Sequence, residues 1–472
     1  MCQSVIRLVI QCLHFVDNLL LTFFGRHIKF PDMSSSRRVT PLIALMSVSA
    51  LALSACSSSS SSEDSALPEN PSVIILSGDG MGPQQRTAIQ YYLYGLDERQ
   101  PMDALPYSGF LDTIPGDPEA AVTDSAAGAT AWAIGQKVPN GTTGLGPDGE
   151  EVPTLMSIAK DRGMVTGLVN DHDITNATLA SFGSPVPDRD LKVDIAKGYL
   201  DNGVDVLFGG GEKYWYPEGN PGKIPDEGED DASEGDSDLV ARAEGDGYQY
   251  AYDQTTFDAL TGPKALALVQ DSAKRRSTEI EGYDYNSDPN YVAPEKLVSK
   301  ALDILGENEK GFFLVIESDD LDSDAHEHDA QNMMLAGESV NEMVKVITEY
   351  QKEHPEVLLI VTADHETGGM TIENVLDDGE PEPNSDQIAD DPVPYWAETP
   401  ENMPLPGGGV PKRSGPFTIK GTDRQFKVDW TTPEHTGTMV PVTAAGPLAE
   451  RFTGVHPNTY VFDVVNELWG TN

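Results

Sequence analysis

Short apolar runs recur along the chain, and each is followed by a polar loop and then by a segment with helical spacing. The apolar runs are Ser72–Ser77, Met164–Asn170, Asp205–Phe208, Phe312–Ile316 and Val357–Thr362. The segments with helical patterns are Asp124–Ile134, Asp190–Asp201, Pro294–Leu305 and Gln331–Lys352. Strands that alternate with helices in this way predict parallel βαβ units. The expected fold class is therefore α/β, with a largely parallel central sheet flanked by helices.

Two segments interrupt this alternation. Residues 226–246 are acidic and nearly free of large apolar side chains, and residues 376–412 are rich in proline, glycine and acidic residues. Segments of such composition bury too little apolar surface to form packed structure. We expect both to be solvated surface insertions in a single domain that spans residues 69–472.

The N-terminal residues are expected to lie outside this domain. Residues 33–55 combine a basic start with the short apolar run Leu42–Ala55, which predicts a secretory signal peptide rather than a membrane span. The run ends Leu-Ser-Ala before Cys56, which resembles the lipobox of bacterial lipoproteins and implies lipidation of that cysteine. Residues 56–68 would then be a Ser-rich tether, and residues 1–32 an upstream extension. The expected location is periplasmic or extracellular, anchored to a membrane through Cys56, with a plain secreted protein as the alternative.

The charge of the chain excludes one class of partner. The sequence has 77 acidic and 31 basic residues, for a formal net charge of -46. Such a surface repels a phosphate backbone, so no nucleic-acid binding is expected. We interpret the acidity as adaptation to a saline medium, in which salt screens the repulsion, with a simply acidic protein as the alternative.

Candidate metal ligands gather where the predicted strands end. Asp79 lies between glycines after the first run, Glu317 follows Phe312–Ile316, and Asp364 with His365 follows Val357–Thr362. Ligand sites in parallel sheets form at the carboxyl ends of strands, so these side chains are expected to meet. Mixed histidine and carboxylate ligands suit Zn²⁺, and ligands that are all oxygen suit Mg²⁺.

Two further positions add to this set. Asp322 and His326 are four residues apart, which places both on one face of a helical turn. Ser125 follows Asp124 at the start of a segment of small residues that predicts a helix. A hydroxyl at a helix N-terminus is well placed to meet an anion, although serine is also an ordinary helix cap.

Taken in order, these motifs resemble those of the alkaline phosphatase family. The resembling motifs are the Asp79 loop, Asp124-Ser125-Ala126, Glu317-x4-Asp322-x3-His326, Thr-Ala-Asp364-His365 and Glu-His435-Thr-Gly. The resemblance extends from about Pro71 to the C-terminus, without the two acidic insertions. It implies hydrolysis of phosphate monoesters at alkaline pH through a phosphoserine intermediate, with release of inorganic phosphate.

The resemblance also implies a role for each matching residue. Ser125 would be the nucleophile, and Arg189 would hold two phosphoryl oxygens in a bidentate contact. One Zn²⁺ would be bound by Asp79, Asp364 and His365. A second Zn²⁺ would be bound by Asp322, His326 and His435, and one Mg²⁺ by Asp79, Thr178 and Glu317.

Two positions depart from the family pattern. Asn176 stands where relatives more often have Asp or His, so weaker Mg²⁺ binding is expected. Ser323 stands where many relatives have a larger polar or basic residue, which affects the expected rate and pH optimum. A phosphodiesterase of the same superfamily and a non-catalytic metal-binding surface lipoprotein are the alternative functions, and a homodimer is left open.

Overall fold

The computed structural model describes residues 69–224, 233–270, 291–375 and 414–471. The predicted upstream extension, signal peptide, Cys56 and tether lie outside the described residues, as does the whole of the predicted insertion 376–412.

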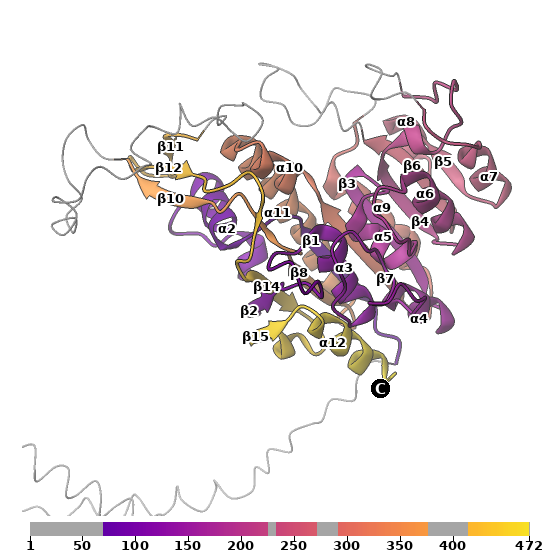
Figure 1. Ribbon diagram of the computed structural model, residues 1–472, viewed down its shortest axis with the longest axis horizontal. Coiled ribbons are helices and arrows are strands. Elements are labelled where there is room, and N and C mark those ends of the chain that lie inside the picture. The colour runs from indigo at the N-terminus through magenta and orange to yellow at the C-terminus, as the bar shows by residue number, and fades with distance from the viewer. Residues whose placement is uncertain (1–68, 225–232, 271–290, 376–413, 472) are drawn as a thin grey trace, which may run out of the picture. The chain divides into compact units, whose positions relative to one another are not determined.

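A 10-stranded sheet forms the centre of the domain (Figure 1). Its strands in spatial order are β15 (Gly454–Pro457), β2 (Tyr107–Asp112), β14 (Val440–Ala445), β8 (Leu358–Thr362), β1 (Val73–Gly78), β7 (Phe312–Ser318), β3 (Val165–Asp173), β4 (Val206–Gly210), β6 (Ala265–Gln270) and β5 (Gln249–Ala251). All of its pairings are parallel except those of β14 with its neighbours β2 and β8. The predicted α/β class and largely parallel sheet are confirmed.

Helices cover both faces of this sheet. They are α2 (Pro83–Ile89), α3 (Ser125–Ile134), α4 (Leu155–Asp161), α5 (Ala177–Gly183), α6 (Lys192–Asp201), α7 (Leu239–Gly245), α8 (Gln254–Asp258), α9 (Pro294–Leu305), α10 (Asp320–His326), α11 (Ala330–Glu353) and α12 (Tyr460–Trp469). Consecutive residues of β7 show the two layers, because strand side chains alternate between faces. Phe312 packs against Tyr350 of α11, whereas Phe313 packs against Phe182 of α5 and Trp469 of α12.

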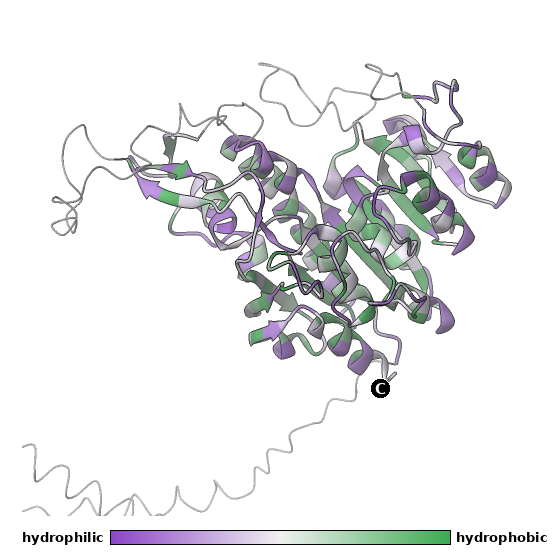
Figure 2. Cartoon of the chain, viewed as in Figure 1, coloured by the Kyte–Doolittle hydropathy of each residue, from purple (hydrophilic) through white to green (hydrophobic). Residues whose placement is uncertain are grey.

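The core follows from this layering. The central strands β1, β7 and β8 are buried at every position, which explains why their sequences read as continuous apolar runs. Figure 2 shows the same distribution, with hydrophobic strands inside and polar residues on the outer faces of the helices. None of the helices in the described part of the chain is long and apolar enough to cross a membrane.

One predicted insertion is only partly a loop. Residues 225–232 lie outside the described residues, but Leu239–Gly245 forms helix α7 and buries Leu239, Val240 and Ala243. Asp238 caps this helix by accepting a hydrogen bond from the Ala241 amide. The prediction of a solvated loop over the whole of 226–246 was therefore wrong, because three apolar residues at helical spacing are enough to dock one turn.

Two small sheets extend the domain beyond the central one. β10 (Thr371–Asn374), β12 (Gln425–Asp429) and β11 (Phe417–Thr418) form an antiparallel sheet that Figure 1 shows away from the main sheet. β9 (Glu366–Thr367) pairs with β13 (His435–Thr436), and this pairing brings His435 next to the end of β8. The remaining short elements are helical turns at Gln90–Tyr94, Pro101–Ala104, Glu212–Tyr214 and Ala449–Phe452.

Candidate active site

Three neighbouring strands deliver acidic residues to one edge of the central sheet. β1 lies between β7 and β8, and Ser77 of β1 is level with Glu317 on one side and Thr362 on the other. Asp79 lies two residues after Ser77, and Asp364 lies two residues after Thr362. Because parallel strands end at the same edge, segments far apart in sequence converge there.

Ser125 begins helix α3 above this edge and is 3% exposed. Asp124 caps the helix, since its Oδ1 accepts from the Ala127 amide at 2.9 Å. Its Oδ2 accepts from the Gly141 amide at 2.9 Å and from Arg189 Nη1 at 3.2 Å. Asp124, the residue before Ser125, therefore both caps the helix and holds the Arg189 guanidinium.

The first group of candidate ligands consists of Asp79, Asp364 and His365, whose ligand atoms all lie within 4.8 Å of one another. His365 Nε2 is 3.4 Å from Asp79 Oδ1 and 3.2 Å from Asp364 Oδ2. It is also 3.2 Å from the Oγ of Ser125. This is the set that the family resemblance implies for one Zn²⁺, and its histidine contacts the serine hydroxyl.

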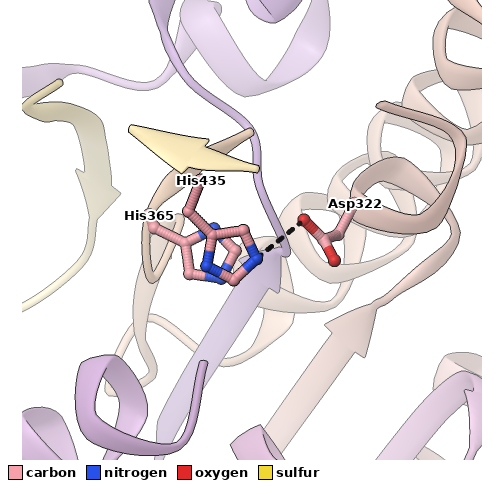
Figure 3. A group of neighbouring side chains, drawn as sticks. All are labelled: Asp322, His365 and His435. Atoms are coloured by element: carbon pink, nitrogen blue, oxygen red, sulfur yellow. Dashed lines mark ion pairs between the residues drawn. The ribbon is translucent and has the colours of Figure 1, made fainter. Parts of the chain in front are cut away.

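The second group consists of Asp322, His365 and His435, and it is shown in Figure 3. His435 Nε2 is 3.7 Å from Asp322 Oδ1, and its ring stacks on that of His365 at 3.5 Å between centroids. The sequence assigned His326 rather than His365 to this group. His326 is also present, with its Nε2 3.1 Å from Asp322 Oδ2 and 3.1 Å from His435 Nε2. His365 is thus shared between the two groups.

Each of the three histidines is held through its other ring nitrogen. Nδ1 of His326 contacts the carbonyl of Pro433, Nδ1 of His435 contacts that of Thr123 at 3.0 Å, and Nδ1 of His365 contacts Thr367 Oγ1 at 3.2 Å. A carbonyl oxygen only accepts hydrogen bonds, so Nδ1 of His326 and Nδ1 of His435 each carry a hydrogen, and Nε2 of each ring faces Asp322. A ring fixed through Nδ1 with Nε2 toward the ligand group is typical of metal-binding histidines.

The charges of the site follow from burial and from neighbouring groups. Burial, together with the neighbouring His435, lowers the pKa of His365 well below its usual value, and burial also lowers the pKa of His435. Burial alone would raise the pKa of Asp322, but its hydrogen bond to His326 and the nearby histidines bring it below the usual range. Burial and the charge of Asp322 raise the pKa of Asp364 to about 7. His365 and His435 are therefore neutral, as Zn²⁺ requires. Burial would lower the pKa of His326, but its hydrogen bond to Asp322 raises it to about 9, so Zn²⁺ would displace a proton from this ring.

The third group is made of carboxylates alone. Asp79, Glu317 and Asp319 have ligand oxygens within 4.8 Å of one another and are all buried. Burial and the charge of Asp319 raise the pKa of Glu317 well above its usual value. The sequence assigned Thr178, not Asp319, to this site. Thr178 is fully buried beside Glu317, so it is near the group.

The residues of these groups fit metal ions. Buried oxygens at Asp364 Oδ2, Glu317 Oε1 and Thr178 Oγ1 have no hydrogen-bond partner among the described residues. Buried polar atoms without partners are costly, and a cation among them would satisfy them. Nε2 of His326 and Nε2 of His435 lie 3.1 Å apart beside the Asp322 carboxylate, which places two nitrogen ligands and one oxygen ligand together.

Sequence reasoning did not identify every residue that shapes the site. Thr367 donates a hydrogen bond to Asp322 Oδ1 and also contacts His365. It therefore links the first and second groups, which combine histidine and carboxylate ligands and are called the mixed groups below. Gly80 has a positive φ of 68°, and a Cβ there would lie 2.8 Å from Asp322 Oδ1, so only glycine fits. His328, two residues after His326, stacks on Trp430 and contacts the Thr432 carbonyl at 2.9 Å, and it belongs to none of the three ligand groups.

Comparison with known proteins supports the family resemblance that the sequence motifs indicated. The family model described as alkaline phosphatase matches residues 70–470. The streptomycin-6-phosphate phosphatase of Streptomyces griseus is 30% identical over 446 residues, which are 84% of this chain and 90% of that protein. A cold-active alkaline phosphatase from a psychrophilic Shewanella species is 29% identical with a TM-score of 0.63, over 84% of this chain and 99% of that one.

A second solved structure, which is less than 25% identical, shows the fold alone. It is a variant of the alkaline phosphatase from the Antarctic bacterium TAB5 with Mg bound in its M3 site, 23% identical with a TM-score of 0.63, over 85% of this chain and 99% of that one. These matches confirm the family resemblance that the sequence motifs indicated.

Proposed function

We propose that this chain, which belongs to the alkaline phosphatase family, hydrolyses phosphate monoesters at alkaline pH through a phosphoserine at Ser125. The family carries the general conclusion that the protein is a metal-dependent phosphatase. The observation that carries the finer proposal is the position of the Ser125 hydroxyl, 3.2 Å from Nε2 of His365, the histidine that belongs to both mixed groups.

Ser125, Arg189 and Asp124 have different roles in the proposed reaction. Ser125 Oγ lies at the N-terminus of α3, where the helix dipole favours the incoming anion. It forms a bond to phosphorus while the ester P–O bond breaks, and the alcohol leaves with a proton. Arg189 binds two phosphoryl oxygens, and burial of this guanidinium is offset by Asp124 and Asp79, whose charges raise its pKa. Asp124 holds Arg189 in place, and the hydrogen bond at 3.2 Å supports this role. Hydrolysis of the phosphoserine then releases inorganic phosphate.

The proposed cofactors are two Zn²⁺ and one Mg²⁺. Asp79, Asp364 and His365 would hold one Zn²⁺, and Asp322, His326 and His435 would hold the other. When bound, the two Zn²⁺ ions would supply the positive charge that lowers the pKa of the Ser125 hydroxyl, stabilises the leaving oxygen and activates water. Asp79, Glu317 and Thr178 would contribute to the Mg²⁺ site.

Hydrolysis of p-nitrophenyl phosphate and of bis(p-nitrophenyl) phosphate, with and without EDTA, tests the proposal. We expect an EDTA-sensitive preference for the monoester that increases at alkaline pH. A preference for the diester would favour the phosphodiesterase alternative. No turnover of either ester by protein that contains its metals would favour the metal-binding lipoprotein.

The location follows from the sequence rather than from the described residues. We propose secretion and lipidation at Cys56, by a signal peptide at residues 33–55. Labelling of cells with a fatty-acid probe tests this, because Cys56→Ser should remove the label. The net charge of -46 supports salt adaptation, which predicts that thermal stability rises from low to high NaCl. Whether the enzyme is a homodimer would follow from light scattering.

A further inference from the structure

Asp319 belongs to the all-carboxylate group, although the family resemblance assigns no role to this residue. We propose that Asp319, in place of Asn176, completes an oxygen-ligand site for a divalent cation together with Asp79 and Glu317. The proposal deepens the proposed function, on which the catalytic meaning of this site rests, but the cation binding itself can be tested without turnover.

Burial of the three carboxylates supports a cation site. Asp79 and Glu317 are each 1% exposed and Asp319 is 6% exposed, and their ligand oxygens lie within 4.8 Å of one another. Negative charges so close together and so far from water repel each other strongly unless a cation lies among them. Three carboxylates without a nitrogen ligand suit Mg²⁺ or Mn²⁺ better than Zn²⁺.

A second observation comes from the hydrogen bonds of Glu317. Its Oε2 accepts from Asn170 Nδ2 at 2.6 Å, which fixes the side chain. Its Oε1 is buried and has no hydrogen-bond partner in the part of the chain that the structure describes. A buried carboxylate held in place at one oxygen and unsatisfied at the other is well prepared to bind a cation.

Asn176 is engaged elsewhere. Its Oδ1 accepts a hydrogen bond from Lys192 Nζ at 2.7 Å, and the same ammonium lies 3.8 Å from Asp173 Oδ2. The amide oxygen that would bind Mg²⁺ therefore already faces a positive charge. An ammonium at this position also repels a divalent cation. Loss of a charged ligand at position 176 is thus balanced by the carboxylate of Asp319 and not by the Asn176 amide.

The turn after β7 holds Asp319 in place. Its backbone amide donates to Asp171 Oδ1 at 2.9 Å, and the neighbouring Ser318 Oγ donates to Asp171 Oδ2 at 2.6 Å. The side chain also pairs with His172, whose Nδ1 is 3.0 Å from Asp319 Oδ2. A carboxylate has about four lone-pair sites, so the contact with His172 leaves acceptor capacity for a cation. The end of β3 therefore orients the ligand that the end of β7 supplies.

Mn²⁺ titration of the zinc-loaded full chain, followed by the electron paramagnetic resonance signal of free Mn²⁺, tests the proposal, with Mg²⁺ as competitor. Asp319→Asn should weaken Mn²⁺ binding by about tenfold or more. Asn176→Ala should leave Mn²⁺ binding unchanged. Asp320→Asn is the matched control, because it removes the same charge one residue away, outside the group. Zinc content and the unfolding temperature show that each variant is folded.

The outcomes separate this proposal from the proposed function. Normal Mn²⁺ binding by Asp319→Asn would overturn the proposal that Asp319 is a ligand. Asn176→Ala decides it independently if Asp319→Asn does not fold, because tenfold weaker binding by Asn176→Ala would overturn it as well. A wild-type protein that binds Mn²⁺ in this way but hydrolyses no monoester would contradict the proposed function and leave the cation site intact.

Discussion

The two mixed groups around His365 differ from the all-carboxylate group around Glu317 in the protonation state of their ligands before a cation binds. Asp79 joins them, because it belongs to the mixed group with Asp364 and also to the carboxylate group. In the mixed groups, burial lowers the pKa of His365 and His435, so these rings are neutral and ready to bind at neutral pH. In the carboxylate group, burial and the charge of Asp319 raise the pKa of Glu317. Burial thus prepares nitrogen ligands for a metal, whereas it makes carboxylates hold protons that a cation must displace.

His365 separates the two kinds of group most strongly, because it belongs to both mixed groups and not to the carboxylate group. His365→Ala should lower monoester hydrolysis by at least about a thousandfold and reduce zinc content. Mn²⁺ binding at the carboxylate group should remain. His456→Ala is the control, since that histidine stacks on Tyr460 away from the ligands. Retained zinc and activity in His365→Ala would show that the mixed groups are not the metal sites.

Arg189 tests the part of the site that belongs to no metal group. Arg189→Ala should lower kcat/KM by roughly a hundredfold, because two charge-assisted hydrogen bonds to the phosphoryl group are lost. Zinc content and Mn²⁺ binding should stay at wild-type values, as measured by elemental analysis and titration. Arg189→Lys keeps the charge without the bidentate contact and should recover only part of the loss. Full activity in Arg189→Ala would exclude it from phosphate binding.

Thr367 links the mixed groups to each other and not to the carboxylate group. Thr367→Val keeps the side-chain shape but removes the hydrogen bonds to Asp322 and His365. Outer-shell contacts of this kind are worth about 10- to 100-fold in metal affinity, so zinc binding should weaken by about that factor. The matched control is Thr371→Val, because the exposed Thr371 hydroxyl donates to the Asp429 carbonyl at 3.3 Å and Thr371 belongs to no ligand group. Equal zinc affinity of the two variants would contradict the linking role.

The pH dependence of stability reports the raised carboxyl pKa values directly. Asp364 has its pKa raised from 3.8 to about 7, so its native state binds the proton more tightly than the unfolded state does. This contribution is fully present below about pH 3.8 and is lost as the pH rises through about 7. The metal-free protein should therefore lose stability between about pH 5 and 8, while the metal-loaded protein loses less. The difference in unfolding temperature between the metal-loaded and the metal-free protein should increase by several degrees over this pH range. A difference that stays constant with pH would contradict the assignment.

The fold was largely predictable because the buried parallel strands have continuous apolar sequences. Pro294–Leu305 was predicted with its observed bounds, and the five apolar runs became β1, β3, β4, β7 and β8. Helix α7 was missed, because an acidic composition hid three apolar residues that pack onto the domain.

The candidate site was less predictable at its edges. Strand β7 was expected to end at Ile316, but Glu317 and Ser318 continue the pairing with β1, and this extension brings Asp319 to the carboxylate group. A polar residue ends an apolar pattern even when its backbone still pairs. The engagement of Asn176 by Lys192 also lay beyond the sequence, because it depends on how the chain on either side of α5 folds back, 16 residues apart.

The proposed function depends on Ser125 as the nucleophile, and acid-quench trapping tests this most directly. Metal-loaded protein mixed with p-nitrophenyl phosphate and quenched in acid should carry a phosphoryl group on the peptide that contains Ser125, as detected by mass spectrometry. Ser125→Ala should carry none and should turn over no monoester, with unchanged zinc content. Phosphate on another residue, or continued turnover by Ser125→Ala, would contradict the account.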